Sequence, residues 1–178
     1  KCDNCNKSMI SMYRDDSDRT VFCLDCYRNR DDCVKYGRDY DFSRSFFDQF
    51  LDLYKKVPMP TLKQNSTSVN CEYANHTYHA KNVYLSYMVS RSEDVLYSQD
   101  ILMGNKICID SFNVKDSERS YENFFCSRNY NCRFLVRTSH CMDSAFLLHS
   151  GNCNNCFMSY NLRNKSYVFR NEQLSREE

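Results

Sequence analysis

Short apolar segments recur about every 12 residues between Asn65 and Leu174, and this repetition restricts the fold more than any other feature of the chain. The segments are KNVYLS, DVLYSQ, ICIDSF, RSYENF, CRFLVR, SAFLLH, NCFMSY and KSYVFR, with matching positions at Tyr84, Tyr97, Ile109, Tyr121, Phe134, Phe146, Phe157 and Tyr167. The intervals are 13, 12, 12, 13, 12, 11 and 10 residues. Such regular spacing is typical of a repeat array.

Each unit has room for one short strand and one turn, so two units predict a coil of about 24 residues, the scale of a β-solenoid rung. The chain has only 3 glycines, so we expect asparagine at the left-handed turn positions of a tight coil. We predict a right-handed β-solenoid of about four rungs that buries aromatic and cysteine side chains in ladders. A β-sandwich or meander of short strands is the alternative.

Two Cys-x-x-Cys pairs lie at the ends of KCDNCNKSMISMYRDDSDRTVFCLDC. SMISMY and RTVF are strand-like and DDSD is typical of a turn, which predicts a hairpin that brings the pairs together. The thiolates of Cys2, Cys5, Cys23 and Cys26 would complete the closed tetrahedron that structural Zn²⁺ prefers. We therefore expect one zinc ion in a zinc ribbon, with iron as the alternative metal. A thioredoxin-like redox pair would lie in a βαβ pattern and would not be doubled.

The sequence predicts three segments: the zinc ribbon over residues 1–30, a linker over 31–64 and the array over 65–174. In the linker, apolar residues at helical spacing predict an amphipathic helix over about residues 44–57, with Ser43 as its cap. The two prolines at positions 58 and 60 would stop it. We expect the apolar stripe to dock on a neighbouring part of the chain, with a partner-binding helix as the alternative. The stripe consists of Phe46, Phe47, Phe50, Leu51, Tyr54 and Val57.

Two further groups of residues are weaker candidates for sites. Cys153 and Cys156 could form a second metal site, but the array period also relates them to upstream cysteines, which favours packing as small hydrophobic side chains. His76 and His79 could belong to a metal-dependent nuclease, although no third ligand is evident. The chain has no Gly-rich phosphate loop and no GxSxG or HExxH motif, so no catalytic site or small-molecule substrate is identified.

Charge is distributed unevenly, although the formal net charge is only +1. Residues 92–122 contain three Lys or Arg against seven Asp or Glu, whereas residues 124–171 contain six Lys or Arg against one Asp. Strand alternation in CRFLVR predicts that Arg133 and Arg137 project outward together, opposite Cys132, Phe134 and Val136. The candidate nucleic-acid contacts are Arg128, Arg133, Arg137, Arg163 and Arg170, with ordinary solvated surface as the favoured interpretation.

The chain resembles an uncharacterised family of zinc-ribbon proteins encoded by candidate-phyla bacteria. The likeness covers essentially the whole chain and is carried by CDNC, MISMY, VFCLDCY, YGRDYDFSRSFFDQF and NLRNKSYVFRNEQLSREE. It implies the same four ribbon thiols and a Cys/Asn/Tyr-rich repeat, and longer relatives with further ribbon-like segments imply that this chain is a central fragment. The repeats of the family are richer in Asn-Cys and Cys-Tyr steps, and many of those positions here hold Val, Ile, Phe or Ser. This departure favours a packing role for the array cysteines.

Together these features predict a mostly β protein with an N-terminal zinc ribbon, a connecting helix and a C-terminal solenoid-like array. We expect a non-catalytic, zinc-containing binding or scaffold protein with a protein partner. The first alternative is a nucleic-acid-binding protein that uses the zinc ribbon and the basic C-terminal half of the array. The second is a metal-dependent, nuclease-like enzyme with His76 and His79. No apolar run has the length of a membrane span and no signal peptide is evident, so a soluble protein of the cytoplasm, with reduced thiols, is expected.

Overall fold

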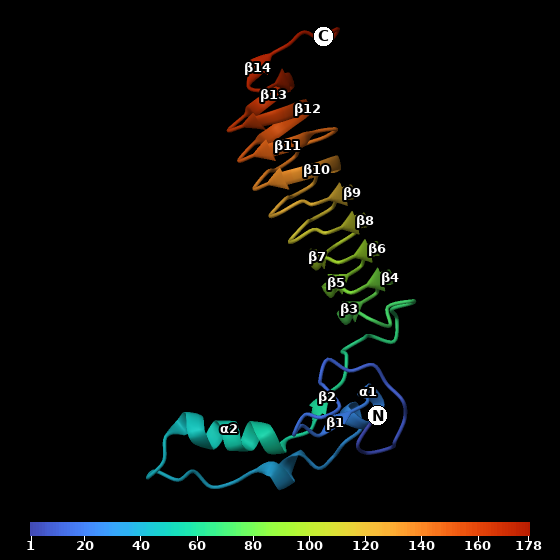
Figure 1. Ribbon diagram of the computed structural model, residues 1–178, viewed down its shortest axis with the longest axis vertical. Coiled ribbons are helices and arrows are strands. Elements are labelled where there is room, and N and C mark those ends of the chain that lie inside the picture. Colours follow the sequence, from blue (N-terminus) through green and yellow to red (C-terminus); the bar gives the residue numbers. More distant parts are fainter. The chain divides into compact units, whose positions relative to one another are not determined.

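The computed structural model describes all 178 residues, and the chain divides into two compact units, residues 1–63 and 64–178 (Figure 1). The first contains β1 (Val21–Phe22), α1 (Leu24–Arg28), the 3-10 helix η1 (Cys33–Tyr36), α2 (Phe46–Lys56) and β2 (Met59–Pro60). The second contains β3 (Asn75–Tyr78), β4 (Lys81–Tyr84), β5 (Tyr87–Ser90), β6 (Glu93–Leu96), β7 (Gln99–Leu102), β8 (Lys106–Ile109), β9 (Glu118–Tyr121), β10 (Tyr130–Val136), β11 (Ala145–Leu148), β12 (Gly151–Tyr160), β13 (Arg163–Phe169) and β14 (Glu172–Gln173).

The second unit is a β-solenoid, which confirms the predicted fold class and excludes the sandwich and the meander. Its strands pair in parallel with a shift of 12 residues, so that Asn75 pairs with Tyr87 and Tyr87 with Gln99. One sequence repeat therefore forms a whole coil, which we call a rung. The predicted 24-residue coil and four rungs are wrong, because the chain closes a coil within one repeat and makes about 8 turns. The right-handedness of the coil stays a prediction.

Every third side chain of the solenoid points inward. In the first rungs the buried positions are Val83, Ser86, Val89, Ser92, Val95, Ser98 and Ile101. The residue before each inward position has a left-handed backbone, as at Leu85 with φ of 43° and Tyr97 with φ of 50°. The chain therefore turns after every three residues, and four such triplets make a rung. Asparagine holds several left-handed positions, as expected, but so do leucine, tyrosine and phenylalanine.

The backbone N–H groups of a triplet find three kinds of acceptor. The first residue donates to a carbonyl of a neighbouring rung, as Tyr87 does to Ser98 at 3.0 Å. The second, left-handed residue donates to the preceding rung, as Tyr97 does to Tyr84 at 3.0 Å. The third residue has no single kind of acceptor: the N–H of Val83 donates to the Asn70 carbonyl at 3.0 Å, whereas the N–H of Ser98 donates to the Ser86 Oγ in the interior at 3.0 Å. Inward serine and asparagine side chains thus accept hydrogen bonds from buried backbone N–H groups that have no acceptor in the strand pairing.

The three-residue period overturns the alternation expected in CRFLVR. Cys132 and Leu135 are buried, whereas Val136 is exposed. Phe134 has a left-handed φ of 55°. That residue turns the chain, so side chains three positions apart, rather than two, share the interior. Arg133 and Arg137 are both exposed, but they belong to different triplets.

Aromatic rings lie on the outside of the solenoid, so the prediction that they are buried is wrong. Tyr97 and Phe146, for example, are exposed by 53% and 46%. A rung encloses only four inward side chains, which leaves no room for rings, and the interior consists mainly of Ser, Val, Cys, Ala, Asn and Leu. The cysteines of the array are buried, as expected. The longest row of outer rings in mutual contact is Tyr121, Phe134, Phe146, Phe157 and Phe169.

One rung is a residue longer than the others. Glu93 pairs with Lys106, a shift of 13 residues. The additional residue is Gly104, which has a φ of +81°, and a Cβ at this position would have no atom within 4 Å. Glycine adopts this backbone without steric cost, so the extra residue bulges outward and the later rungs keep their register.

Glutamine side chains finish both ends of the solenoid. At the start, the Gln64 amide donates to the carbonyls of Cys71 and Ala74. At the end, β14 turns back antiparallel to β13, and the Gln173 amide donates to the Ser166 carbonyl at 2.8 Å. Both amides bind carbonyl groups that have no further rung to pair with, which limits pairing between solenoid ends.

In the first unit, the predicted hairpin does not form. β1 pairs in parallel with β2, through Val21 with Met59 and Phe22 with Pro60. The segment SMISMY contains no strand. The chain that follows α2 therefore supplies the strand that pairs with β1, instead of the preceding segment.

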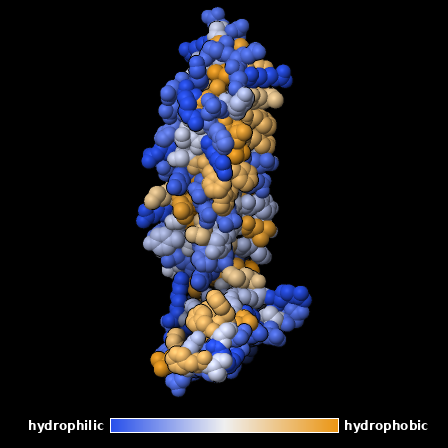
Figure 2. Space-filling view, turned by 90° about the vertical axis from the view of Figure 1, so that its left-hand side faces the viewer, coloured by the Kyte–Doolittle hydropathy of each residue, from blue (hydrophilic) through white to orange (hydrophobic).

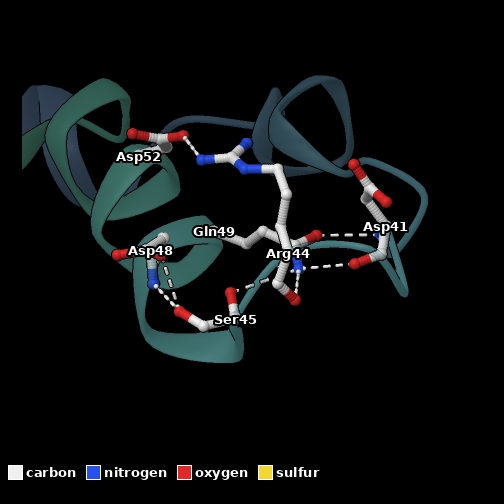
Figure 3. A network of polar contacts seen from close by, with 6 residues as sticks. All are labelled: Asp41, Arg44, Ser45, Asp48, Gln49 and Asp52. Atoms are coloured by element: carbon white, nitrogen blue, oxygen red, sulfur yellow. Dashed lines mark hydrogen bonds and ion pairs between the residues drawn. The ribbon is translucent and has the colours of Figure 1, made fainter.

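A polar network fixes the start of α2 (Figure 3). Ser45, not the predicted Ser43, caps the helix by accepting a hydrogen bond from the Asp48 N–H at 3.2 Å. Gln49 exchanges hydrogen bonds with the backbone of Asp41, at 2.8 Å and 2.9 Å. Ser43 instead donates to the Asp41 carboxylate at 2.6 Å. The predicted cap residue, Ser43, therefore binds the Asp41 side chain instead of a backbone N–H of the helix.

The apolar stripe of α2 is exposed, contrary to the expectation that it docks within the chain. Phe46, Phe47 and Phe50 are exposed by 57%, 79% and 53%, and Gln49 is the only buried residue of the helix. The side of α2 that meets the preceding segment is therefore polar. Neither α-helix combines the length and apolar composition that crossing a membrane requires.

Candidate metal centre

The first Cys-x-x-Cys pair lies in a tight loop at the start of the chain. The Cys2 N–H donates to the Lys7 carbonyl and the Asn6 N–H donates to the Cys2 carbonyl, both at 2.9 Å. Asn6 has a left-handed φ of 58°, which asparagine tolerates better than most residues. The loop therefore holds Cys2 and Cys5 on the same side of a short turn.

The second pair lies where β1 leads into α1. Cys23 is the N-cap residue of α1, and Cys26 lies within that helix. An isolated helix of 5 residues is unstable, because a single turn fixes many dihedral angles for few hydrogen bonds. Interactions outside the helix must therefore stabilise this turn.

Asp3 joins the two loops. Its backbone N–H donates to the Val21 carbonyl at 3.0 Å, and its carboxylate accepts the Val21 N–H at 2.6 Å. Two residues further along, the Cys23 N–H lies 3.1 Å from the Cys2 Sγ. This role of Asp3 was not predicted, since a carboxylate between two cysteines carries no recognisable signal for it.

The four predicted thiols converge. The Sγ atoms of Cys2, Cys5, Cys23 and Cys26 all lie within 4.8 Å of one another, and those of Cys5 and Cys23 are 3.8 Å apart. In a tetrahedral site with Zn–S bonds of about 2.3 Å, the sulfur atoms are about 3.8 Å apart. Cys2 and Cys23 are buried, whereas Cys5 is exposed. The cluster therefore fits a metal ion held by four thiolates.

Protonation of the cluster is uneven. Burial raises the pKa of Cys2, but hydrogen bonds from the backbone of Cys23, Cys5 and Asn4 outweigh it and lower the pKa to about 6. The Asn4 side chain lowers the pKa of Cys26, but the neighbouring thiols of Cys23 and Cys5 raise that pKa to about 12. Four adjacent sulfur atoms therefore do not all ionise readily by themselves. A bound cation would remove that obstacle by compensating the negative charge.

Cys153 and Cys156 lie in the solenoid interior. Their thiols donate to the carbonyls of Gly151 and Asn154, at 3.3 Å and 3.4 Å. Inward serines bind a carbonyl two residues earlier in the same way, as Ser159 does with Phe157 at 2.9 Å. Neither cysteine belongs to a converging group of three or more His, Cys, Asp or Glu ligands. The contacts match a packing role, and the second metal site stays a prediction.

The other array cysteines share this environment. Burial raises the pKa of Cys108 and Cys141 to about 12 and that of Cys132 to about 11. These thiols are therefore protonated at neutral pH, which suits small buried side chains rather than metal ligands or nucleophiles.

His76 and His79 occupy left-handed positions of successive triplets. The His76 ring packs edge-on against Tyr87, with centroids 4.9 Å apart, and the His79 ring packs against Tyr78 at 4.2 Å. No converging group of metal ligands includes either histidine. The nuclease-like site thus gains no third ligand and stays a hypothesis.

The five candidate arginines do not form one row, because each holds a different position within its rung. Arg128 lies 3.9 Å from the Asp116 carboxylate, Arg163 donates to the Leu162 carbonyl at 2.7 Å, and Arg170 lies over the Phe169 ring. A strand of nucleic acid that follows the solenoid would meet few of them at once. Nucleic-acid binding by these residues stays a prediction.

Comparison with known proteins adds no assignment: no model of a protein family matches the chain, and no curated protein matches it significantly.

Proposed function

We propose that the protein is a non-catalytic, zinc-containing scaffold that presents a regular surface to protein partners. The observation that carries this proposal is the convergence of four thiols within 4.8 Å. Four protein ligands satisfy tetrahedral zinc and leave no position for a water molecule or a substrate. An ion in such a site contributes folding free energy, about 10 kcal/mol or more in small zinc modules.

The solenoid supports the scaffold part of the proposal. Each rung contacts mainly its neighbours through strand pairs and interior hydrogen bonds, which makes the array a quasi-linear element with long rows of equivalent outward positions. Such rows suit recognition over an extended surface. The buried thiols and serines of the array bind backbone carbonyls, so they maintain the coil instead of facing a substrate.

Elemental analysis of the purified full chain tests the metal assignment. We expect about one zinc ion per chain in protein prepared under reducing conditions. A count near zero in metal-replete protein would refute the site. A visible thiolate-to-iron absorption band together with one iron ion per chain would assign iron instead. A count near two would revive the second site at Cys153 and Cys156.

Affinity recovery of the tagged chain from cells, at native abundance, tests the scaffold role. A defined protein that copurifies in constant ratio, and that is lost when the solenoid surface is altered, is the expected result. Turnover of a substrate by the metal-loaded chain would contradict the non-catalytic assignment. So would activity that disappears on His76→Ala and His79→Ala.

A further inference from the structure

One outward column of the solenoid carries opposite charges at its two ends and apolar residues between them. The column holds the left-handed residue of the same triplet in six successive rungs. From first to last these are Asp110, Glu122, Phe134, Phe146, Met158 and Arg170. We call this row the Phe134 column. In the reverse order, Arg170 takes the place of Asp110, and Phe134 and Phe146 exchange places.

A second apolar row lies on the next triplet around the coil. Parallel pairing aligns it from rung to rung, and it consists of Phe112, Phe124, Val136, Leu148 and Tyr160. We call this row the Leu148 column. Phe124, Leu148 and Tyr160 are exposed by 44%, 45% and 64%. Figure 2 shows apolar side chains gathered in a band along the solenoid.

The exposed apolar area of these rows is large for a surface without a partner. An aromatic side chain has about 200 Å² of surface, so rings that are about two-fifths exposed leave about 80 Å² each. The rows and the adjoining rings therefore offer on the order of 600 Å² of apolar surface, near the upper end for an ordinary monomer surface. A specific interface needs about 800 Å² per partner. The band is thus large enough to form most of one.

We propose that two copies of this chain associate face to face and antiparallel through the Phe134 and Leu148 columns. A two-fold axis midway between Phe134 and Phe146 would set each of these rings opposite the other in the second copy. The same axis sets Asp110 opposite Arg170 and Glu122 opposite Met158. Both copies have the same rung spacing of about 4.8 Å, so every rung meets an equivalent rung without loss of register.

Charge selects the antiparallel arrangement over a parallel one. In a parallel pair, the acidic ends, with Asp110 and Glu122, would lie side by side, and so would the basic ends. Like charges brought together across an interface oppose association, whereas complementary ends steer and orient it. The surrounding sequence has the same polarity, since residues 92–122 are acidic overall and residues 124–171 are basic overall.

Charge reversal in the full chain tests this arrangement through the mass and dissociation constant measured by sedimentation at several concentrations. Asp110→Lys and Arg170→Glu should each weaken dimerisation about tenfold or more, because each places like charges together. The double variant Asp110→Lys/Arg170→Glu restores opposite charges only in an antiparallel pair, and its dimer should return to within about threefold of the original. A double variant that dimerises no better than the single variants would overturn the proposal.

An apolar variant supplies the second test. Leu148→Asp should abolish the dimer, whereas Met142→Asp, the control, should leave it intact. Met142 is similarly exposed, at 47%, but it lies outside the two columns, in the row Tyr130, Met142 and Asn154. Circular dichroism checks that each variant keeps the fold, and the charge variants still decide the question if Leu148→Asp does not.

A monomeric original chain at every concentration would overturn the proposal. A dimer indifferent to all these changes would do so too, since it would use another surface. The metal content plays no part, so these outcomes are independent of the zinc assignment.

Discussion

The Ser98 hydroxyl accepts a hydrogen bond from the backbone N–H of Ser111, one rung further along the solenoid, at 3.1 Å. The same hydroxyl donates to the Leu96 carbonyl at 2.7 Å. Ser98 in turn donates its own N–H to Ser86. Serine thus links three rungs through the interior, in a position where an apolar side chain would leave an amide without an acceptor.

Removing one such hydroxyl should therefore be costly for so small a change. Ser98→Ala leaves the buried N–H of Ser111 unsatisfied, which costs about 1–3 kcal/mol of unfolding free energy. Ser127→Ala, at an outward position, should change stability by less than about 0.5 kcal/mol. Urea unfolding of the two variants measures the difference. Equal effects would show that the interior hydrogen bond contributes little.

The metal centre should respond to its own cysteines and not to a neighbouring one. Cys23→Ser removes a ligand, so we expect the metal content to fall from about one ion per chain to near zero. The first unit should lose order, while the far-ultraviolet dichroism of the solenoid persists. Cys33→Ser is the control, because Cys33 is exposed and lies outside the cluster. Retention of one ion by Cys23→Ser would contradict the four-thiolate site.

Alkaline pH should destabilise the solenoid through its buried thiols. Burial raises the pKa of Cys108 from 9.0 to about 12, so between these values the unfolded chain has lost a proton that the folded chain retains. The contribution of this thiol to the free energy of unfolding is thus fully present below about pH 9. It is lost as the pH rises toward 12, by at most about 1.4 kcal/mol per pH unit. Urea unfolding of Cys108→Val should show a shallower decline than the original chain. Identical slopes would contradict the assignment.

Two glycine-related changes test how the 13-residue rung is accommodated. Gly104→Ala should cost about 1 kcal/mol, because alanine is strained at positive φ although space is available. Deleting Gly104 should be tolerated, since it leaves an ordinary 12-residue rung. Deleting Asp116, an exposed left-handed residue of such a rung, should unfold the array or lower its stability by several kcal/mol, because every later inward side chain would shift outward. Thermal unfolding compares the three variants.

The cap of α2 can be tested at the two candidate serines. Ser45→Ala should reduce helix stability by about 1 kcal/mol, because Ser45 accepts the Asp48 N–H. Ser43→Ala should have a smaller effect on the helix, because its hydroxyl binds only the Asp41 side chain. Amide hydrogen exchange across Phe46–Lys56 measures both effects. Faster exchange in Ser43→Ala than in Ser45→Ala would reverse the assignment.

The array and the metal cluster could be predicted because each depends on spacing alone. Paired Cys-x-x-Cys motifs indicate a four-ligand site whatever local fold brings them together, so the wrong hairpin did not affect the choice of Cys2, Cys5, Cys23 and Cys26. The apolar segments likewise indicated the 12-residue period.

The size of the coil could not be predicted in the same way. It depends on left-handed backbone at residues such as Leu85, Tyr97 and Phe134, which ordinarily avoid that region. The informative signal was the run of small residues at every third position, from Ser86 and Val89 to Ser92. The aromatic residues at outward strand positions are easier to recognise in the sequence than this run. Because such residues are usually buried in other folds, they were wrongly predicted to fill the interior of the solenoid.

The 12-residue period determines which outward column each side chain of the solenoid occupies. Duplication or loss of one whole rung would lengthen or shorten the rod by about 4.8 Å and leave every remaining side chain in its column. Gain or loss of a single residue would scramble the columns unless a glycine such as Gly104 absorbs it. The length of this rod can therefore evolve in discrete steps of one rung while its surface chemistry stays constant.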